Sequence, residues 1–197
     1  MSWTEHVLQF WEGVHKRSSN VHIGNTNAID YVNYFEKVGP FARDLQKATS
    51  VLDVGPGFGR FLNDQRSKDK HAIEISELGR SRLAERGVKA CAPGEIGSVG
   101  VDLAACLSVV QHCDEPAFKV ILADTFRALR PGGRLYMNGI HGGHHTPSPE
   151  GLLHGGRCSY SPARVRELAA EAGFGVENDH VYRLGATEIW VFRLRKP

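Results

Sequence analysis

The sequence predicts an α/β fold: a doubly wound, seven-stranded sheet with an antiparallel C-terminal strand, preceded by N-terminal helices. Two observations support this prediction. From about residue 48 onward, apolar runs with strand character alternate with helical segments, which is typical of a parallel sheet with crossover helices. The chain then ends in two consecutive strands, 174–181 and 187–194, joined by a short turn at Leu184-Gly185. Strands joined by so short a turn pair antiparallel.

Composition limits the classes of protein to which the chain can belong. Its 197 residues suit one α/β domain, and its 41% apolar and 23% charged residues are ordinary for a globular protein. The formal net charge of +2 is too small to favour nucleic acid or a membrane as a partner. No apolar run is long enough to span a bilayer, and the N-terminus does not fit a signal peptide. The four cysteines contain no C-x-x-C pair, so we expect reduced thiols in a cytoplasmic protein.

The first 47 residues are expected to form a helical cap on a domain that spans 48–197. Apolar residues at near-helical spacing predict one helix over 3–17 and a second over 26–38. Pro40 stops or restarts the second helix, and a short helix is expected to run to Lys47.

The stretch 51–61 is the most informative part of the chain. Val51 to Val54 reads as a short buried strand with one acid, three glycines follow at alternate positions, and a helix begins near Arg60. A strand, a tight glycine turn and a helix N-terminus bring backbone close to a ligand. A dinucleotide fingerprint, G-x-G-x-x-G, would need glycine where Arg60 stands. A NAD-type oxidoreductase is therefore disfavoured.

A second motif follows at the next predicted strand, His71–Ile75. Glu74 comes 19 residues after Gly55, and an acid at that distance is placed to accept hydrogen bonds from two ribose hydroxyls. The alternative is an acid that is solvated at a strand end. The other elements expected around it are a helix from the glycine turn to Gln65, a helix at 77–86 that Gly87 stops, strands at 88–90, 101–107 and 134–138, a loop at 91–100, a helix at 114–129, a turn at 130–133, a long loop at 139–158 and a helix from Ser161-Pro162 to Gly173.

Three stretches resemble the class I (Rossmann-like) S-adenosylmethionine (SAM) methyltransferases of small-molecule type. They are the D-x-G-x-G-x-G pattern from Asp53 to Gly59, the acid at Glu74, and the sequence ALRPGGRL at 128–135. The resemblance covers about residues 48–195, and the C-terminal strand pair fits the hairpin of that fold. It implies SAM as the cofactor and direct transfer of its methyl group to a small-molecule acceptor.

The resemblance also implies which residues bind SAM. In the family the glycine turn lies against the methionine part of SAM, and Asp53 would help to hold its amino group. Glu95 and Ile96 are the nearest matches to the family's adenine contacts, although its common Gly-Asp form is missing here. The full set expected to bind the cofactor is Asp53, Gly55, Gly57, Gly59, Glu74, Ile75, Glu95, Ile96, Ser108 and Gln111.

Two histidines are candidates for a catalytic base. The stretch Ser108–His112 resembles the family's strand-four ending at the methyl-transfer site, and His141 follows the fifth predicted strand. A hydroxyl acceptor benefits from a base that titrates near neutral pH, as imidazole does, whereas an amine or carboxylate acceptor needs none. The alternative for His112 is a histidine that holds a backbone carbonyl at a helix start.

The acceptor is expected beneath the N-terminal helices and the loop at 139–158, which we interpret as a lid. In the family such helices commonly build part of the acceptor pocket, and so long a loop is uncommon unless it is functional or mobile. For the aromatic residues of these helices, packing is the alternative. The residues expected to bind the acceptor are Trp11, Tyr31, Tyr34, His144 and His145.

The sequence also bears on several other functions. The spacing of His141, His144, His145, His154 and Cys158 matches no standard zinc site, so no metal is expected. DNA-base methylation is disfavoured because the chain has no Asn-Pro-Pro-Tyr or Asp-Pro-Pro-Tyr motif and no basic recognition domain. A SAM-binding protein that regulates or assembles without transferring methyl groups is the alternative to an enzyme. The acceptor, O- versus N-methylation and the oligomeric state, for which a homodimer is one candidate, stay open.

Overall fold

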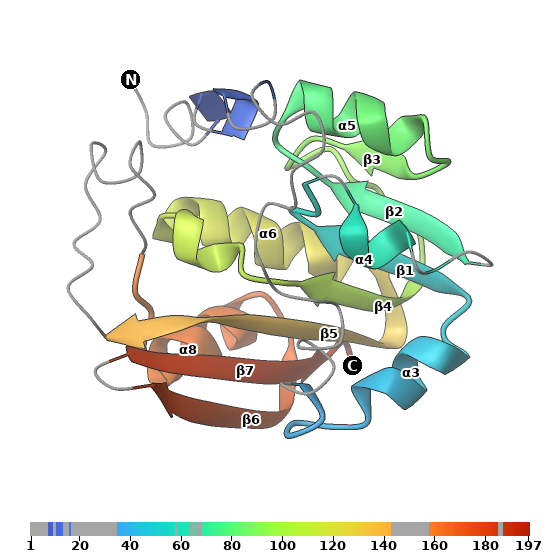
Figure 1. The fold of residues 1–197 in the computed structure, drawn as a ribbon. Coiled ribbons are helices and arrows are strands. Elements are labelled where there is room, and N and C mark those ends of the chain that lie inside the picture. The colour runs from blue at the N-terminus through green and yellow to red at the C-terminus, as the bar shows by residue number, and fades with distance from the viewer. Residues whose placement is uncertain are drawn as a thin grey trace.

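A computed structural model describes residues 8–9, 11–13, 16, 35–57, 59–63, 65, 68–142, 158–184 and 187–197. Seven strands in this part of the chain form one sheet with helices on both faces (Figure 1). In chain order the elements are α3 (Phe41–Lys47), β1 (Ser50–Val54), α4 (Arg60–Asn63), β2 (Asp69–Ile73), α5 (Glu77–Ala84), β3 (Lys89–Cys91), β4 (Val101–Cys106), the 3-10 helix η1 (Val110–His112), α6 (Glu115–Ala128), β5 (Leu129–Gly142), α8 (Pro162–Glu171), β6 (Gly175–Leu184) and β7 (Thr187–Arg195).

The strand order is β3-β2-β1-β4-β5-β7-β6. β1 to β5 are parallel, and β7 runs antiparallel between β5 and β6. The predicted seven-stranded fold with an antiparallel C-terminal strand is therefore confirmed. The order reverses between β1 and β4, and open α/β sheets bind ligands at that switch point, beyond the carboxyl ends of the strands. Val54 pairs with Ile73 on one side and Cys106 on the other, so the residues that follow these three leave the sheet at the same edge.

Two core clusters cover the two faces of the sheet (Figure 1). On one face, α6 and α8 contribute Phe118, Leu122 and Leu168 to the core. On the other face, Phe41 of α3 and Leu83 of α5 are buried together with α4. A sheet covered on both faces explains why β1 and β4 are almost continuous apolar runs.

Helix boundaries follow the predicted capping chemistry where the structure describes them. Ser76 caps α5 by accepting from the Gly79 amide at 3.0 Å, and Ser161 caps α8 by accepting from the Arg164 amide at 3.2 Å. Gly87 ends the α5 segment with a positive φ of 72°, a conformation that glycine adopts without strain. The predicted helix starting at Ser161-Pro162 and the predicted stop at Gly87 are confirmed.

The fifth strand differs from the prediction. It was expected over 134–138, between a turn and a loop, but β5 runs from Leu129 to Gly142. The Arg-Pro-Gly-Gly segment at 130–133 stays in the sheet as a bulge. The register between β5 and β4 shifts there, and the Gly132 amide donates to the Lys196 carbonyl. At the other end the strand continues because β7 pairs with it as far as Gly142. His141 therefore lies in a strand and does not open a loop.

The described N-terminal residues belong to the same packed body. Residues 8–9, 11–13 and 16 are helical, as predicted for the first helix. Phe35 and Val38 are buried in the cluster that contains Phe41, and α3 has the predicted extent. The Tyr136 hydroxyl of β5 donates to Asp44 of α3 at 2.7 Å, which ties α3 to the sheet. The proposed division of the chain at residue 47 stays a prediction.

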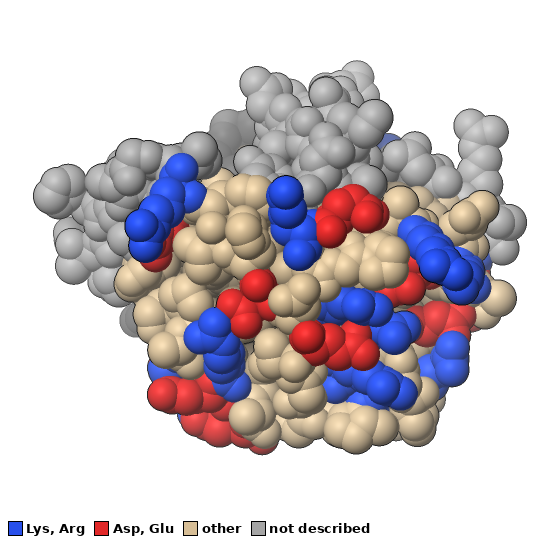
Figure 2. All heavy atoms as spheres, turned by 90° about the horizontal axis from the view of Figure 1, so that it is seen from below, with Lys and Arg blue, Asp and Glu red and all other residues tan. Residues whose placement is uncertain are grey.

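The edge of the sheet formed by β6 carries charges of both signs. In the view that Figure 2 gives of the molecule, Lys and Arg alternate with Asp and Glu and form no single basic field. Arg166 of α8 pairs with Asp179 of β6 at 2.6 Å, and Arg134 of β5 pairs with Glu177 at 2.9 Å. Charges on an edge strand oppose pairing with other chains. Within the residues that the structure describes, no helix has the length and apolar character needed to cross a membrane.

Candidate functional site

The glycine turn after β1 has a backbone that side chains would disturb. Gly55, Gly57 and Gly59 have φ values of 64°, 57° and 74°. A Cβ on Gly55 would lie 2.7 Å from a methyl group of Val109, and one on Gly59 would lie 2.6 Å from a methyl group of Leu83. Backbone conformation therefore favours glycine at all three positions, and close packing also requires it at Gly55 and Gly59.

Glu74 follows β2 and joins the glycine turn to the start of α5. One of its carboxylate oxygens accepts from the Gly57 amide at 3.0 Å and the other from the Ser76 amide at 2.9 Å. The side chain is buried, and this burial raises the pKa of Glu74 from its ordinary value of 4.5 to about 7, although the two amide hydrogen bonds oppose the rise. Arg80 donates to the backbone carbonyls of Glu74 and Ile75 and so fixes the loop that carries the acid.

Asp53 is a second buried acid at the same edge. It is 3% exposed and precedes the glycine turn by two residues. Burial, together with the charge of Glu74, raises the pKa of Asp53 well above its ordinary value. Two buried acids next to a glycine turn make this edge the candidate functional site, because perturbed pKa values gather at such sites.

The residues after β4 turn sharply at Ser108. This serine has a φ of 57°, and no other described residue except glycine has a positive φ. Its amide donates to Oδ1 of Asn138 at 2.9 Å, and Nδ2 of Asn138 donates to the serine hydroxyl at 3.2 Å. Gln111 is buried in η1, where its backbone carbonyl accepts from the Cys158 amide. The turn thus brings Ser108 and Gln111 to the switch point.

His112 meets the N-terminal segment. The rings of Trp11 and His112 form an edge contact with centroids 5.4 Å apart. The neighbouring Glu12 accepts from the Glu77 amide at 2.6 Å, at the first turn of α5. Trp11 and Glu12 therefore connect the end of β4 with the end of β2, on either side of β1.

His141 occupies a different part of the edge. It lies on β5 opposite Glu188 of β7, four residues beyond the last residue of β5 that pairs with β4. Its Nδ1 is 3.3 Å from the hydroxyl of Ser159. The structure thus places both histidines at the carboxyl edge, His112 against the N-terminal segment and His141 beside Ser159, three residues before α8.

The loop expected to bind adenine is held from α6. Glu95 is exposed and its carboxylate accepts from the Ala92 amide at 3.0 Å, whereas Ile96 is buried in the core. Asp124 of α6 accepts from the Gly94 amide at 2.6 Å, and Arg127 donates to the Ile96 carbonyl at 3.1 Å. Asp124 and Arg127 therefore fix the backbone on both sides of Glu95.

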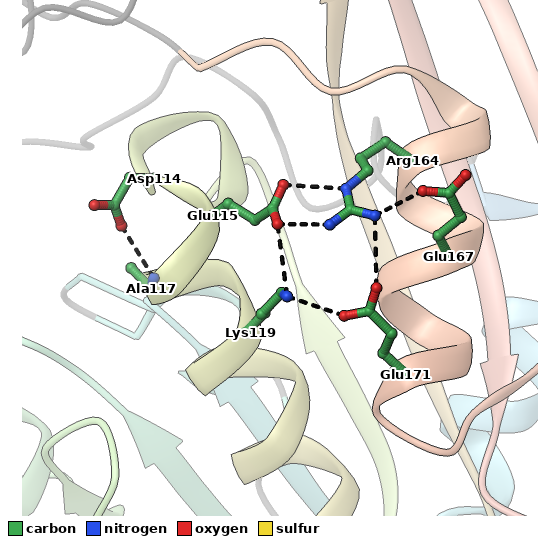
Figure 3. Close-up of polar contacts among 7 residues, drawn as sticks. All are labelled: Asp114, Glu115, Ala117, Lys119, Arg164, Glu167 and Glu171. Carbon is green, nitrogen blue, oxygen red and sulfur yellow. Dashed lines mark hydrogen bonds and ion pairs between the residues drawn. The ribbon is translucent and has the colours of Figure 1, made fainter.

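An ion-pair network fixes the helix that follows η1 (Figure 3). Arg164 of α8 binds both carboxylate oxygens of Glu115, at 3.1 and 2.6 Å, and also lies 2.6 Å from Glu167. Lys119 of α6 lies 3.0 Å from Glu171 of α8, which adds a second link between the two helices. The first turn of α6, which begins three residues after His112, is thereby held against α8.

Four of the predicted acceptor-binding residues, Tyr31, Tyr34, His144 and His145, lie outside the described residues. Trp11 is described and contacts His112. Among the side chains that the structure does describe, no three of His, Cys, Asp and Glu are grouped so that they could hold a metal ion.

Comparison with known proteins identifies the fold. No family model and no curated protein matches the chain. Solved structures do match at low identity. Phosphoethanolamine N-methyltransferase 2 from Haemonchus contortus, bound to phosphomonomethylethanolamine and S-adenosylhomocysteine, has a TM-score of 0.72 at 14% identity, over 100% of this chain and 60% of that one. Magnesium protoporphyrin IX methyltransferase from Synechocystis PCC 6803, bound to S-adenosylhomocysteine, has a TM-score of 0.67 at 14% identity over 100% of both chains.

The chain has the class I methyltransferase fold. It spans 60% of the length of the first structure. The fold does not fix the reaction, because a [4+2]-cyclase shares it, with a TM-score of 0.58 at 16% identity over 76% of this chain and 75% of that one.

The residues at this edge of the class I methyltransferase fold suit SAM. Gly55, Gly57 and Gly59 carry no side chains, so a ligand can approach their backbone closely. Glu74 and Asp53 supply buried oxygen acceptors, which match ribose hydroxyls and an ammonium group. Glu74 keeps acceptor capacity, because each of its carboxylate oxygens accepts one backbone hydrogen bond and has room for a second.

Three residues that position this edge were not predicted from the sequence. Asn138 stands in the apolar strand β5, and Asp124 stands on the buried side of α6, so each carried a signal, a polar residue among core positions. Glu12 carried none, because its hydrogen bond to Glu77 spans 65 residues.

Proposed function

We propose that this protein is a SAM-dependent methyltransferase that transfers a methyl group to a small-molecule acceptor by direct displacement. The observation that carries the proposal is the junction between Gly57 and Glu74, where the backbone of a glycine turn meets a buried acid at the switch point of a class I methyltransferase fold. The cofactor would be SAM, which when bound supplies an electrophilic methyl group on a sulfonium. The fold match at low identity supports the cofactor class but not the acceptor.

The chain's own residues divide the work along the edge of the sheet. Glu74 accepts hydrogen bonds from the ribose hydroxyls, and Asp53 helps to hold the amino group of the methionine part. The glycine turn lets the cofactor approach the backbone closely. Ser108 and Gln111, which follow β4, face the cofactor from that side. Methyl transfer needs nucleophile, carbon and sulfur in line, so holding two reactants in that geometry is itself a large contribution to the rate.

A hydroxyl acceptor would also need a base. His112 is the first candidate because η1 is fixed to its surroundings, by the ring of Trp11 against His112 and by the Cys158 amide, which donates to the Gln111 carbonyl. His141 is the second candidate and lies on the rigid strand β5. Only the neutral imidazole can accept the acceptor's proton at a ring nitrogen. An amine or carboxylate acceptor would make both histidines binding groups only.

A small acceptor is favoured over nucleic acid by charge. Lys and Arg on the face in Figure 2 are interspersed with acids, and the formal net charge of the chain is +2. The names of two of the similar structures also point to small acceptors, phosphomonomethylethanolamine and a porphyrin. These acceptors belong to those proteins, and for this chain they indicate only the size class to test first.

Two measurements test the proposal in sequence. Calorimetry of the purified protein with SAM, S-adenosylhomocysteine and NAD should show binding of the first two and no binding of NAD. Turnover of labelled SAM on a panel of small hydroxyl, amine and carboxylate compounds should then transfer label to at least one class. Binding of SAM without turnover on any class would favour the alternative, a regulatory or assembly protein that binds SAM, and absence of SAM binding would overturn both.

A further inference from the structure

The end of β4 contains the one described residue other than glycine with a positive φ. Ser108, at 57°, lies in the left-handed region that residues with a Cβ disfavour. Such a conformation persists only where the surroundings impose it, and it gathers at functional sites. The question is which group imposes it here.

Asn138 is placed to do so. It lies on β5, the neighbour of β4, one residue past the last β4–β5 pair, Cys106 with Met137. Its side chain is buried, and its amide group makes two hydrogen bonds to one residue: Oδ1 accepts from the Ser108 amide at 2.9 Å, and Nδ2 donates to the Ser108 hydroxyl at 3.2 Å. The amide group of Asn138 thus supplies both the acceptor and the donor of this pairing.

The direction of the turn matters for the residues that follow it. Directly after Ser108, a methyl group of Val109 lies so close to Gly55 that a Cβ there would be 2.7 Å away. The His112 amide donates to the Val109 carbonyl at 2.8 Å, so η1 starts from the same point. A change of φ at Ser108 would move Val109 away from the glycine turn and would move His112 with it.

We infer that Asn138 is a positioning residue that holds Ser108 in its left-handed conformation and thereby fixes Val109 over the glycine turn and His112 at the edge. This inference deepens the proposed function and rests on it for the identity of the ligand. Asn138 acts through Ser108 and not by contact with substrate. Its role is conformational, so a residue at position 108 that reaches the same φ without help should make Asn138 dispensable.

Glycine at position 108 provides that test, because glycine adopts a positive φ without steric strain. Four proteins are compared: wild type, Asn138→Ala, Ser108→Gly and the double variant. We expect Asn138→Ala to weaken SAM binding about tenfold, the size of one lost hydrogen-bonded constraint, and to lower turnover. Because Ser108 belongs to the residues expected to bind SAM, Ser108→Gly sets a reference affinity of its own. Asn138→Ala should then cost about tenfold in the wild-type background and almost nothing in the Ser108→Gly background.

A stability control separates positioning from general damage. Thr125→Val removes another buried hydrogen bond, from the Thr125 hydroxyl to the Ile121 carbonyl inside α6, away from the carboxyl edge. It should lower the melting temperature as Asn138→Ala does, with unchanged SAM affinity. The chemical shift and titration of His112, followed by NMR without cofactor, report the position of η1 independently of activity and should move in Asn138→Ala and return in the double variant.

The outcomes distinguish the positioning role of Asn138 from the identity of the cofactor. If Asn138→Ala costs as much SAM affinity in the Ser108→Gly background as in wild type, or if it leaves both SAM affinity and the His112 resonance unchanged in the wild-type background, the positioning role is wrong. If wild type fails to bind SAM while the His112 resonance shifts and recovers as expected, the positioning role holds and the proposed cofactor is wrong.

Discussion

The same sheet holds its acids in two opposite ways at its two ends. Asp102, the second residue of β4, accepts from the Thr49 amide at 2.6 Å and from the Thr49 hydroxyl at 2.8 Å, and it pairs with Arg130. Burial opposes its ionisation, but these donors outweigh it and hold the pKa of Asp102 well below its ordinary value. Glu74, at the carboxyl end, has a pKa raised to about 7 by burial. The donors and the cation around Asp102 therefore compensate its charge within the protein, whereas the donors around Glu74 do not compensate for its burial.

This difference indicates where the chain retains binding capacity. An acid that is matched by donors and a cation contributes to stability and has nothing left for a ligand. When an acid is buried with two amide donors and no side-chain cation bonded to it, its ionised form is destabilised. A ligand that donates hydrogen bonds from hydroxyl groups would stabilise that ionised form. The comparison therefore assigns structure to the amino end of β4 and binding to the carboxyl ends of β1, β2 and β4.

The largest expected effect is that of Gly57→Val, which should abolish SAM binding while the protein stays folded. Gly57 has a φ of 57° and donates its amide to Glu74, so a branched side chain would strain the turn and occupy the ligand's side of it. The matched control is Gly132→Val near the start of β5, where φ is 77°. Calorimetry should show no SAM binding in the first variant and wild-type affinity in the second.

The next effect concerns the two histidines and applies to a hydroxyl acceptor. His112→Ala or His141→Ala should lower turnover roughly 10²- to 10⁴-fold, because one of them removes a proton from the acceptor, and should leave SAM affinity nearly unchanged. The wild-type rate should rise with pH through a histidine-like transition. Rates measured across pH check this. Near-wild-type rates in both variants, with a flat pH profile, would instead point to an amine or carboxylate acceptor.

A smaller effect tests the raised pKa of Glu74 directly. Only the carboxylate accepts fully from hydroxyl donors, so SAM affinity should fall as pH drops below about 7, by up to tenfold for each pH unit. The stability of the free protein should change in the opposite sense. The fold favours protonated Glu74, so its contribution is complete below pH 4.5 and is lost as pH rises through about 7.

Glu74→Gln is the variant that checks this linkage. It should weaken SAM by about 1–3 kcal/mol at pH 8, the usual loss for a hydrogen bond to a charged group. Its affinity should vary less with pH between 6 and 8 than that of the wild type. Calorimetric titrations of both proteins at several pH values give the result. A wild-type affinity that does not vary with pH in this range would contradict the raised pKa.

The sequence allowed the sheet and part of the edge to be predicted, and particular residues show why. The alternation of strand-like and helical segments predicted the seven-stranded sheet. Spacing predicted an acid at the end of the second strand, and the structure adds that this acid, Glu74, accepts from the Gly57 amide of the glycine turn. Both depend on local pattern. The extent of β5 was missed because Pro131 and Gly132 are turn residues by propensity, and pairing with β4 and β7 overrides that preference. The role of Asn138 was missed because its partner lies 30 residues away.

The smallest effect is expected at the matched end of the sheet. Asp102→Asn should reduce the free energy of unfolding by about 1.5–3 kcal/mol, the contribution of hydrogen bonds to a charged group, because the amide nitrogen of asparagine cannot accept from Arg130. SAM affinity should not change. Since the pKa of Asp102 is lowered in the fold, its contribution is present above the unfolded value of about 3.9 and is lost as pH falls below it. The difference in unfolding free energy between wild type and variant, measured in urea, should therefore shrink between pH 5 and pH 3. A variant that keeps full stability but loses SAM would reverse the assignment of the two ends, since binding would then depend on the acid that is already matched.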